Sequence, residues 1–267
     1  MAFRPSRRLA DFPYWLLALA LLGVLTLWAI VSDQGYASIF RALSGGIFTT
    51  IWVTLVAFGL AIAVGAVAAL MRTSGQPVLV QMATFYTELI RGIPILVFLF
   101  YVAFVGAPST IVAANWLTQP LQALGWMPQL TVRNFDLTWR AIIALMICYS
   151  AFLAEVFRAG IEAVPEGQLE AARALGLSRG QIFRKIVAPQ AFRIILPPLG
   201  NDFVSMIKDS ALVSSLGVQD ITQLGKVYSA ATFKFFETYN VVAFLYLTMT
   251  ISLSLIVRYI ERRMHRY

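Results

Sequence analysis

The chain has 267 residues, of which 59% are hydrophobic and only 13% are charged. Soluble globular domains carry roughly 25% charged and about 45–50% apolar residues, so the composition excludes an ordinary soluble fold and favours a protein embedded in a bilayer. The net charge of +8 is expected to reflect membrane topology rather than nucleic-acid binding, because Lys and Arg concentrate on the cytoplasmic side of membrane proteins.

The N-terminus carries three arginines, at positions 4, 7 and 8, ahead of an apolar run over residues 13–31. This arrangement resembles a signal peptide. However, the run is longer than the apolar region of about 7–15 residues that signal peptides contain, and no cleavage site of small residues closes it. We therefore expect a retained spanning helix.

Six segments are predicted to span a membrane, since a spanning helix needs about 20 mostly apolar residues. They are residues 13–31, 48–71, 83–105, 140–158, 191–208 and 239–259. In the second segment Ala61, Gly65 and Ala69 recur every four residues. This spacing reflects either ordinary alanine-rich composition or a face on which another helix approaches closely.

The fifth segment is interrupted by Pro197, Pro198 and Gly200 and is predicted to be a broken helix. Such breaks are tolerated where the backbone lines a cavity or is covered by protein. Residues 106–139, with three prolines and with Trp116 and Trp126, are predicted to form an outer loop whose tryptophans lie at the membrane interface.

Residues 209–238 are predicted to form a second outer, or partly re-entrant, stretch. If the N-terminus is cytoplasmic and the spans alternate, the inner segments hold about two thirds of the 21 Lys and Arg residues. This excess predicts that both termini lie in the cytoplasm.

The long inner loop, residues 159–190, carries the strongest local signals. Pro165 and Glu166 suit a helix start, and Gly176 suits a helix end. Ser178 and Gln181 have the spacing of a capping box, so a second short helix is predicted there, ending before the proline at position 189. A plain connector needs only a few residues, so this helix-turn-helix is interpreted as a docking surface.

The same loop resembles a known family. It is similar to the EAA loop of ABC importer permeases at residues 170–172 (Glu-Ala-Ala), at Gly176 and at residues 186–189 (Ile-Val-Ala-Pro). That family usually has Leu where this chain has Ala188. Three flanking segments resemble the polar amino acid permease subfamily, with Ile93 where Thr is typical. These segments are residues 88–94, 195–201 and 208–213.

The resemblance implies an all-α membrane protein. It would have the five-helix core of an ABC type I importer permease over residues 44–260, an extra N-terminal helix within residues 1–35, and a cytoplasmic tail over residues 261–267. Alternating access would be driven by a separate ATPase. The residues expected to couple to that ATPase are Glu170, Ala171, Ala172, Gly176, Ile186 and Pro189.

The resemblance also implies the partners and the location. ATP and magnesium would be bound by the ATPase, with no cofactor on this chain. A second permease, as another copy or a paralogue, would complete the pore, and a periplasmic or tethered solute-binding protein would deliver the substrate. The substrate would be a polar amino acid of the glutamine, glutamate, arginine or histidine class. The protein would lie in a bacterial cytoplasmic membrane.

Ionisable groups at membrane depth are functional candidates by default. We expect Arg91, Asn201 and Lys208 to meet a substrate carboxylate, with Glu88 or Asp209 near its ammonium. The alternative reading is structural. The pair at positions 88 and 91 has the i,i+3 spacing of mutual neutralisation, and Lys208 and Asp209 suit an interfacial position.

Two further groups fit the structural reading. Asp202 either caps or pairs at the expected break or lies on the substrate path, whereas Glu155 and Arg158 are expected simply to pair.

Several motifs are missing from the sequence. No Gly-x-x-x-x-Gly-Lys-Ser/Thr phosphate loop is present, and Gly225-Lys226 lacks its other members. The single cysteine, Cys148, and the single histidine, His265, supply neither a zinc set nor a nucleophile–base pair. We therefore expect no enzymatic activity.

An autonomous secondary transporter or channel remains the main alternative function. It predicts internal repeats of the spanning bundle, which the sequence does not display, and it leaves the long inner loop unexplained. A membrane scaffold is a further alternative, but it would not need helix breaks or ionisable groups at membrane depth.

Overall fold

The computed structural model describes residues 14–264, and every regular secondary-structure element in that range is a helix. The α-helices are α2 (Tyr14–Ser32), α3 (Gln34–Arg72), α4 (Pro77–Arg91), α5 (Ile95–Tyr101), α6 (Ala107–Ala123), α7 (Leu137–Glu162), α8 (Glu166–Ala174), α9 (Arg179–Ile182), α10 (Ala188–Asp209), α11 (Ile221–Thr232) and α12 (Phe235–Met264). Two π-helical segments, Val102–Gly106 and Phe183–Val187, continue α5 into α6 and α9 into α10.

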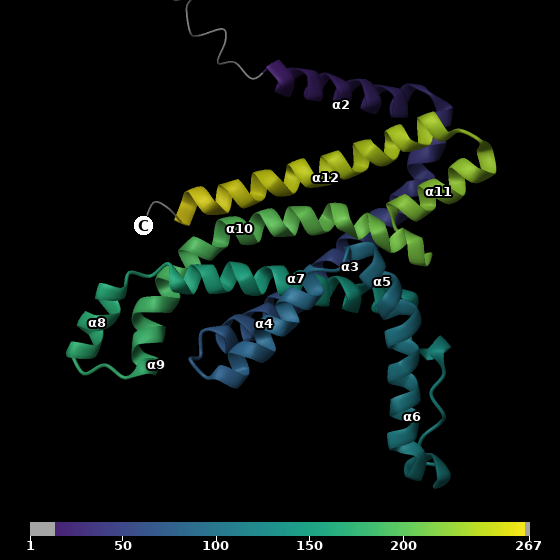
Figure 1. Cartoon of the computed structure of the whole chain (residues 1–267). Coiled ribbons are helices and arrows are strands. Elements are labelled where there is room, and N and C mark those ends of the chain that lie inside the picture. The colour runs from purple at the N-terminus through teal and green to yellow at the C-terminus, as the bar shows by residue number, and fades with distance from the viewer. Residues whose placement is uncertain (1–13, 265–267) are drawn as a thin grey trace, which may run out of the picture.

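The long helices form an elongated bundle. In Figure 1, α7, α10 and α12 run alongside one another, and α8 and α9 project together from one end. Helix α6 leaves the bundle near its other end and points away, across the direction of α7. The most extensive packing joins α3 to α7, and α10 packs against both α7 and α12.

Small residues on α3 allow its close approach to α7. Ala61, Gly65 and Ala69 are all buried, which confirms the helix-packing interpretation of their spacing. A Cβ atom added to Gly65 would lie 2.9 Å from the carbonyl oxygen of Ser150 and 3.0 Å from the Cβ of Leu153. The backbones of the two helices therefore meet at this glycine, as close interhelical contacts in membranes require.

Replacing Gly65 by Leu is expected to destabilise the bundle by about 1–3 kcal/mol, because overpacking forces the helices apart. Gly59, on the same helix, is exposed and has nothing within 4 Å of an added Cβ, so Gly59→Leu should leave stability nearly unchanged. Thermal unfolding of the two variants in detergent measures the difference, and equal unfolding temperatures would contradict the close contact.

Two predicted boundaries in the first half of the chain were wrong. The segment 83–105 is not one span, because α4 ends at Arg91 and α5 begins only at Ile95. Pro94, the N-cap of α5, cannot donate a backbone hydrogen bond and forces this break. Much of the predicted outer loop 106–139 is helical, since α6 occupies Ala107–Ala123.

The physical reason for α6 lies in the positions of its prolines. Pro108 is in the first turn, where a missing N–H costs nothing, and Pro120 lies in the last turn. The glycine that suits a helix end comes only at Gly125, which adopts φ +72°. The segment 209–238 is also largely helical, with a 3₁₀ segment over Ser210–Leu216 followed by α11.

The predicted break in the fifth span is wrong as well. Helix α10 continues from Ala188 to Asp209 with Pro197 and Pro198 inside it. Each proline removes one backbone hydrogen bond, but α10 is held by packing against α7 and α12. Such packing lets helices in membranes tolerate proline.

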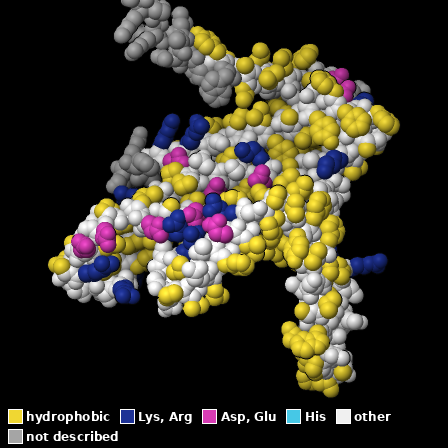
Figure 2. Space-filling model, in the orientation of Figure 1, with side chains coloured by type: hydrophobic (Ala, Val, Ile, Leu, Met, Phe, Trp, Pro, Cys, Tyr) yellow, Lys and Arg dark blue, Asp and Glu magenta, His cyan; other side chains and the backbone are white. Residues whose placement is uncertain are grey.

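Four helical segments of the described chain are long and apolar enough to cross a membrane. They are Gln34–Arg72, Ile95–Ala123, Leu137–Glu162 and Phe235–Arg263, and a shorter apolar helix covers Leu17–Ser32. Figure 2 shows hydrophobic side chains over α2, α6 and much of the bundle. Charged side chains gather at the α8–α9 end and in a cluster near the middle of this face.

Candidate functional site

Helix α8 of the inner loop ends in a Schellman motif. The N–H of Leu177 donates to the carbonyl of Ala172 at 3.1 Å, and the N–H of Gly176 donates to that of Arg173 at 2.9 Å. Gly176 has φ +77°, a conformation that L side chains adopt only with strain. The predicted turn at Gly176 is confirmed.

Replacing Gly176 by Ala should cost roughly 1–2 kcal/mol locally, because a side chain destabilises the left-handed conformation. The expected result is faster hydrogen–deuterium exchange across α8, measured by mass spectrometry. Gly167→Ala is the matched control, because Gly167 lies within α8 and has nothing within 4 Å of an added Cβ. Unchanged exchange in the Gly176 variant would contradict this role.

Helix α9 begins with the predicted capping box. The N–H of Gln181 donates to Ser178 Oγ at 3.4 Å, and the N–H of Ser178 donates to Gln181 Oε1 at 2.9 Å. Helix α9 itself ends at Ile182, before Pro189 as predicted, but the helical path of the chain does not end there. A π-helical segment, Phe183–Val187, carries the chain directly into α10. Pro189 fits because it lies in the first turn of α10.

The loop has a small core of its own, built from buried Val164, Ala172, Ile182, Val187 and Ala191. Since Ala191 belongs to α10, this core fixes α8 and α9 to the start of that helix. A hydrogen bond from Gln190 Nε2 to Gln168 Oε1 at 2.7 Å joins α8 to α10 in the same way. The loop is thus a compact unit continuous with α10.

The six predicted coupling residues divide into two groups. Glu170, Ala171 and Pro189 are exposed, as is Gly176 at the turn. Ala172 is only 2% exposed and Ile186 is half-buried, and both belong to the core of the loop. The exposed residues are accessible to a partner. The two buried residues instead pack in the core beneath that surface.

A polar cavity of about 390 Å³ lies where α4, α7 and α10 meet. It is lined by Arg91, Phe152, Glu155, Val156, Ala159, Gly160, Ile194, Pro198 and Asp202. Gly160 permits the approach of α10, because a Cβ there would lie 2.3 Å from Ile195 Cγ1. Two predicted residues, Arg91 and Asp202, therefore share one cavity.

Glu155 is already neutralised. Its carboxylate forms ion pairs with Arg158 and with Arg72, and Arg158 also pairs with Glu162. The predicted pairing of Glu155 with Arg158 is confirmed, but the partner on α3 was not foreseen. The half-buried carboxylate thus contributes little net charge to the cavity that it lines.

Arg91 and Asp202 are the cavity charges without an ion pair in the described chain. The Arg91 guanidinium carbon lies 5.8 Å from the centre of the Phe152 ring, a cation–π contact. No ion pair joins it to Glu88 in the described part of the chain, so the alternative of mutual neutralisation is not observed. Glu88 itself is exposed.

The remaining predicted residues lie elsewhere. Lys208 lines a different cavity of about 300 Å³, between α2, α10 and α12, together with Arg258. Asp209 accepts a hydrogen bond from the hydroxyl of Tyr149 at 2.6 Å, and Asn201 is exposed. The structure therefore does not bring all the predicted charges into one site.

Sequence reasoning missed Phe152 as a wall of the polar cavity and Arg72 as a partner of Glu155. Phe152 lies three residues before Glu155 on α7, so helical periodicity offered a signal for it. Nothing local pointed to Arg72, because it is 83 residues from Glu155 in sequence. Among the described residues no group of three or more His, Cys, Asp or Glu side chains suits a metal ion, and His265 lies outside them.

Comparison with known proteins agrees with this architecture. The family described as "binding-protein-dependent transport system inner membrane component" matches residues 61–266. The glutamine transport system permease protein GlnP of Escherichia coli (strain K12) is 33% identical over 80% of this chain and 89% of its own length. The L-cystine transport system permease protein TcyB of Bacillus subtilis (strain 168) is 32% identical over 90% of this chain and 93% of its own.

A solved structure is also similar. The crystal structure of an amino acid ABC transporter with histidines shares 34% identity and a TM-score of 0.70, covering 88% of this chain and 98% of that one. The predicted all-α ABC importer permease fold and its non-catalytic role as a transport component are thus confirmed. The chain belongs to the family of inner membrane components of binding-protein-dependent transport systems.

Proposed function

We propose that this chain carries amino acids across the cytoplasmic membrane, driven by a separate ATPase that docks on the α8–α9 loop. The observation that supports this docking site is the structure of the loop. It is a compact unit in which Glu170 and Ala171 are exposed, and it connects to α10 without a break in the helix. The substrate class is inferred from relatives whose names specify glutamine and L-cystine.

The proposed orientation sets the α8–α9 end and both termini in the cytoplasm. Lys and Arg side chains gather at this end of the molecule (Figure 2), as expected for a cytoplasmic face. Helix α2 is then the additional N-terminal span ahead of the core. ATP and magnesium are bound by the ATPase, and a solute-binding protein delivers substrate from outside.

The polar cavity is the proposed substrate path. A free amino acid is a zwitterion, and the cavity offers it one cation, Arg91, and one anion, Asp202. Pro198 has no N–H to donate to the carbonyl of Ile194, and both residues line the cavity. That carbonyl is a second acceptor suited to an ammonium group, as in transporters whose helices have interrupted hydrogen bonding.

A mechanical link follows from this arrangement. Helix α10 begins at Ala188, contributes Ala191 to the core of the coupling loop (residues 159–190) and lines the cavity at Pro198 and Asp202. A displacement of the loop by the ATPase therefore moves one wall of the cavity. A second permease, either another copy or a paralogue, completes the pathway on the exposed side of Arg91.

Purification of the tagged chain from its native membrane tests this proposal. We expect a stoichiometric ATPase to co-purify, and we expect the reconstituted complex to need both ATP and a solute-binding protein for uptake. A chain that purifies alone and transports amino acids without ATP would instead identify an autonomous transporter.

A further inference from the structure

Helix α6 turns its polar side chains inward, the reverse of a helix in water. Asn115, Thr118 and Gln122 are half-buried on the face covered by residues 124–136, which we call the return segment. Asn115 Nδ2 donates to the carbonyl of Leu130 at 2.8 Å, and Asn115 Oδ1 accepts from the N–H of Leu130 at 2.9 Å. Gln122 Nε2 donates to Asn115 Oδ1 at 3.0 Å. The polar groups of this face are thus bonded within the chain.

The opposite face of α6 is apolar and open. Val112 is 70% exposed, Trp116 73% and Leu117 69%, and Figure 2 shows hydrophobic side chains along this helix. Residues 107–135 contain a single charged side chain, Arg133, which belongs to the return segment. The exposed polar residues of α6 are Ser109, Thr110, Gln119. Because contact with water disfavours so large an apolar surface, something apolar is expected to cover it.

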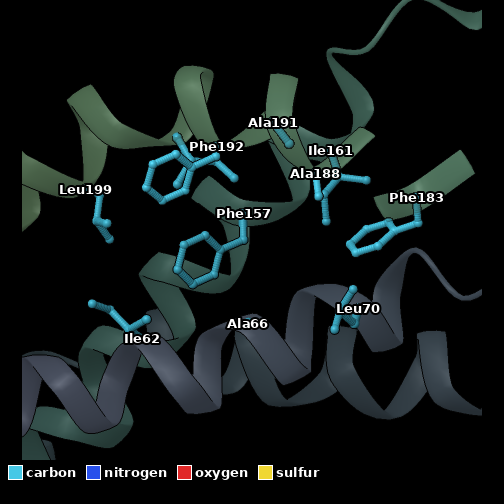
Figure 3. A pocket seen from close by; sticks show the side chains of 11 residues that line it. Ile62, Ala66, Leu70, Phe157, Ile161, Phe183, Ala188, Ala191, Phe192 and Leu199 are labelled. Carbon is cyan, nitrogen blue, oxygen red and sulfur yellow. The ribbon is translucent and has the colours of Figure 1, made fainter. Parts of the chain in front are cut away.

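The cover comes from outside the described chain. Helix α6 packs against its neighbours in sequence, the π-helical segment Val102–Gly106 and the 3₁₀ turn Val132–Asn134 of the return segment. Apolar side chains near the coupling loop are enclosed instead. Figure 3 shows Phe157 and Phe183 opposite Leu70 in a cavity of about 310 Å³ between α3, α7 and α10. The apolar face of α6 has no such walls within residues 14–264.

Arg140 fixes the place where α6 leaves the bundle. This arginine, at the start of α7, is only 7% exposed. Its guanidinium donates to the carbonyl of Ala103, before α6, at 3.2 Å, and to the carbonyl of Phe135, after the return segment has come back, at 2.8 Å. It also donates to the carbonyl of Val132. Both ends of the hairpin are therefore held at the end of α7 that is remote from the coupling loop.

The direction of α6 determines what its apolar face meets. In Figure 1, α6 runs across α7, and the return segment lies on the side of α6 away from the coupling loop. Because α7 is long and apolar enough to cross a membrane, α6 runs along the membrane plane. The run Ile95–Ala123 is also long enough to cross, but its first part packs against α7 and α6 then leaves the bundle. The apolar face of α6, opposite the return segment, is thus turned back toward the bilayer, and the irregular return segment faces water.

We infer that α6 lies flat in the outer leaflet of the membrane, with its apolar face among the acyl chains just below the lipid headgroups. The inference uses the proposed orientation to assign the leaflet, but it does not use the proposed substrate path. Protein interfaces carry a polar rim and about one hydrogen bond per 100–200 Å², whereas the polar side chains of α6 point inward, so lipid fits this face better than a protein does. Trp116, together with Trp126 just beyond α6, suits the boundary between headgroups and acyl chains. The hairpin thus anchors the outer end of α7 to the leaflet.

Spin labels on single cysteines test this inference in proteoliposomes of phosphatidylcholine and phosphatidylglycerol. The background is Cys148→Ala, which removes the one native cysteine. Val112→Cys and Ala123→Cys place labels at exposed positions on one line of α6, three turns or about 16 Å apart along its axis. Gln129→Cys labels the exposed return segment as the matched control. Both α6 labels should be severalfold more accessible to oxygen than to a soluble nickel chelate, at one common depth of about 5–10 Å. The control label should favour the chelate.

Three results would overturn the inference. Chelate accessibility at Val112 and Ala123 equal to that at Gln129 would show that α6 stands in water. Exclusion of both reagents would show that a protein, such as a second copy of the chain, covers the apolar face. Depths that differ by about 16 Å would show that α6 crosses the membrane. Depth is measured from the nearer bilayer surface and needs neither ATPase nor substrate, so the result is independent of the proposed transport function and orientation.

Discussion

Replacement of Glu170 by Arg is expected to abolish ATP-driven uptake while leaving the chain folded and inserted. Glu170 is exposed on α8 and takes no part in the core of the loop, so its reversal should not unfold the loop. A charge reversal on the proposed docking surface would juxtapose unmatched charges, which costs several kcal/mol in binding. The ATPase should therefore no longer co-purify with the chain.

The control is Gln119→Arg, which introduces an arginine at an exposed position on α6, far from the coupling loop. This variant should keep its ATPase. Gel filtration and circular dichroism establish that both variants are folded, and subunit stoichiometry and uptake are then compared in proteoliposomes. Full ATPase retention by the Glu170 variant would show that docking occurs elsewhere on the chain.

Arg91→Ala and Asp202→Asn are each expected to reduce amino acid uptake by about ten- to hundredfold. Each removes one charge-assisted partner of a zwitterion, and hydrogen bonds to charged groups contribute roughly 1.5–3 kcal/mol. Both residues line the same cavity and lack an ion pair among the described residues. Neither change should release the ATPase, because the coupling loop is unaltered.

Glu88→Gln is the matched control for these variants. Glu88 lies three residues before Arg91 on α4 but is exposed, and it is not among the residues that line the polar cavity. Uptake by this variant should stay close to that of the parent. Normal uptake by both Arg91→Ala and Asp202→Asn would remove the cavity from the substrate path, and a severe loss with Glu88→Gln would favour the alternative ammonium partner.

The polar cavity also predicts a selectivity for net neutral amino acids. Glu155 lines the cavity, but its charge is balanced by Arg72 and Arg158. If Arg72 is replaced by Gln, Glu155 keeps only one partner and the cavity becomes more negative. Competition assays should then show cationic amino acids inhibiting uptake more strongly than in the parent. An unchanged ranking of competitors would contradict the neutralising role of Arg72.

The sequence by itself determined the features that depend on neighbouring residues. Apolar composition required a membrane protein, and Ser178, Gln181 and Gly176 specified the ends of the short helices through local capping. Pro94 explains the break between α4 and α5 by a local effect within its own turn, although residues 83–105 were predicted to form one span. The small residues of α3 were compatible with a packing face, but the sequence left ordinary composition as an equal reading, and only the structure established the face and the helix that meets it.

Only the tertiary structure decided the features that depend on distant residues. Pro197 and Pro198 carry the same local signal as Pro94, yet α10 stays continuous because α7 and α12 enclose it. Arg72 and Glu155 meet because α3 packs on α7. Lys208 is separated from Arg91 because the face of α10 that carries Lys208 is not the face that lines the polar cavity. Capping and proline chemistry act within one helical turn, whereas helix continuity and charge pairing at membrane depth are set by the surrounding helices.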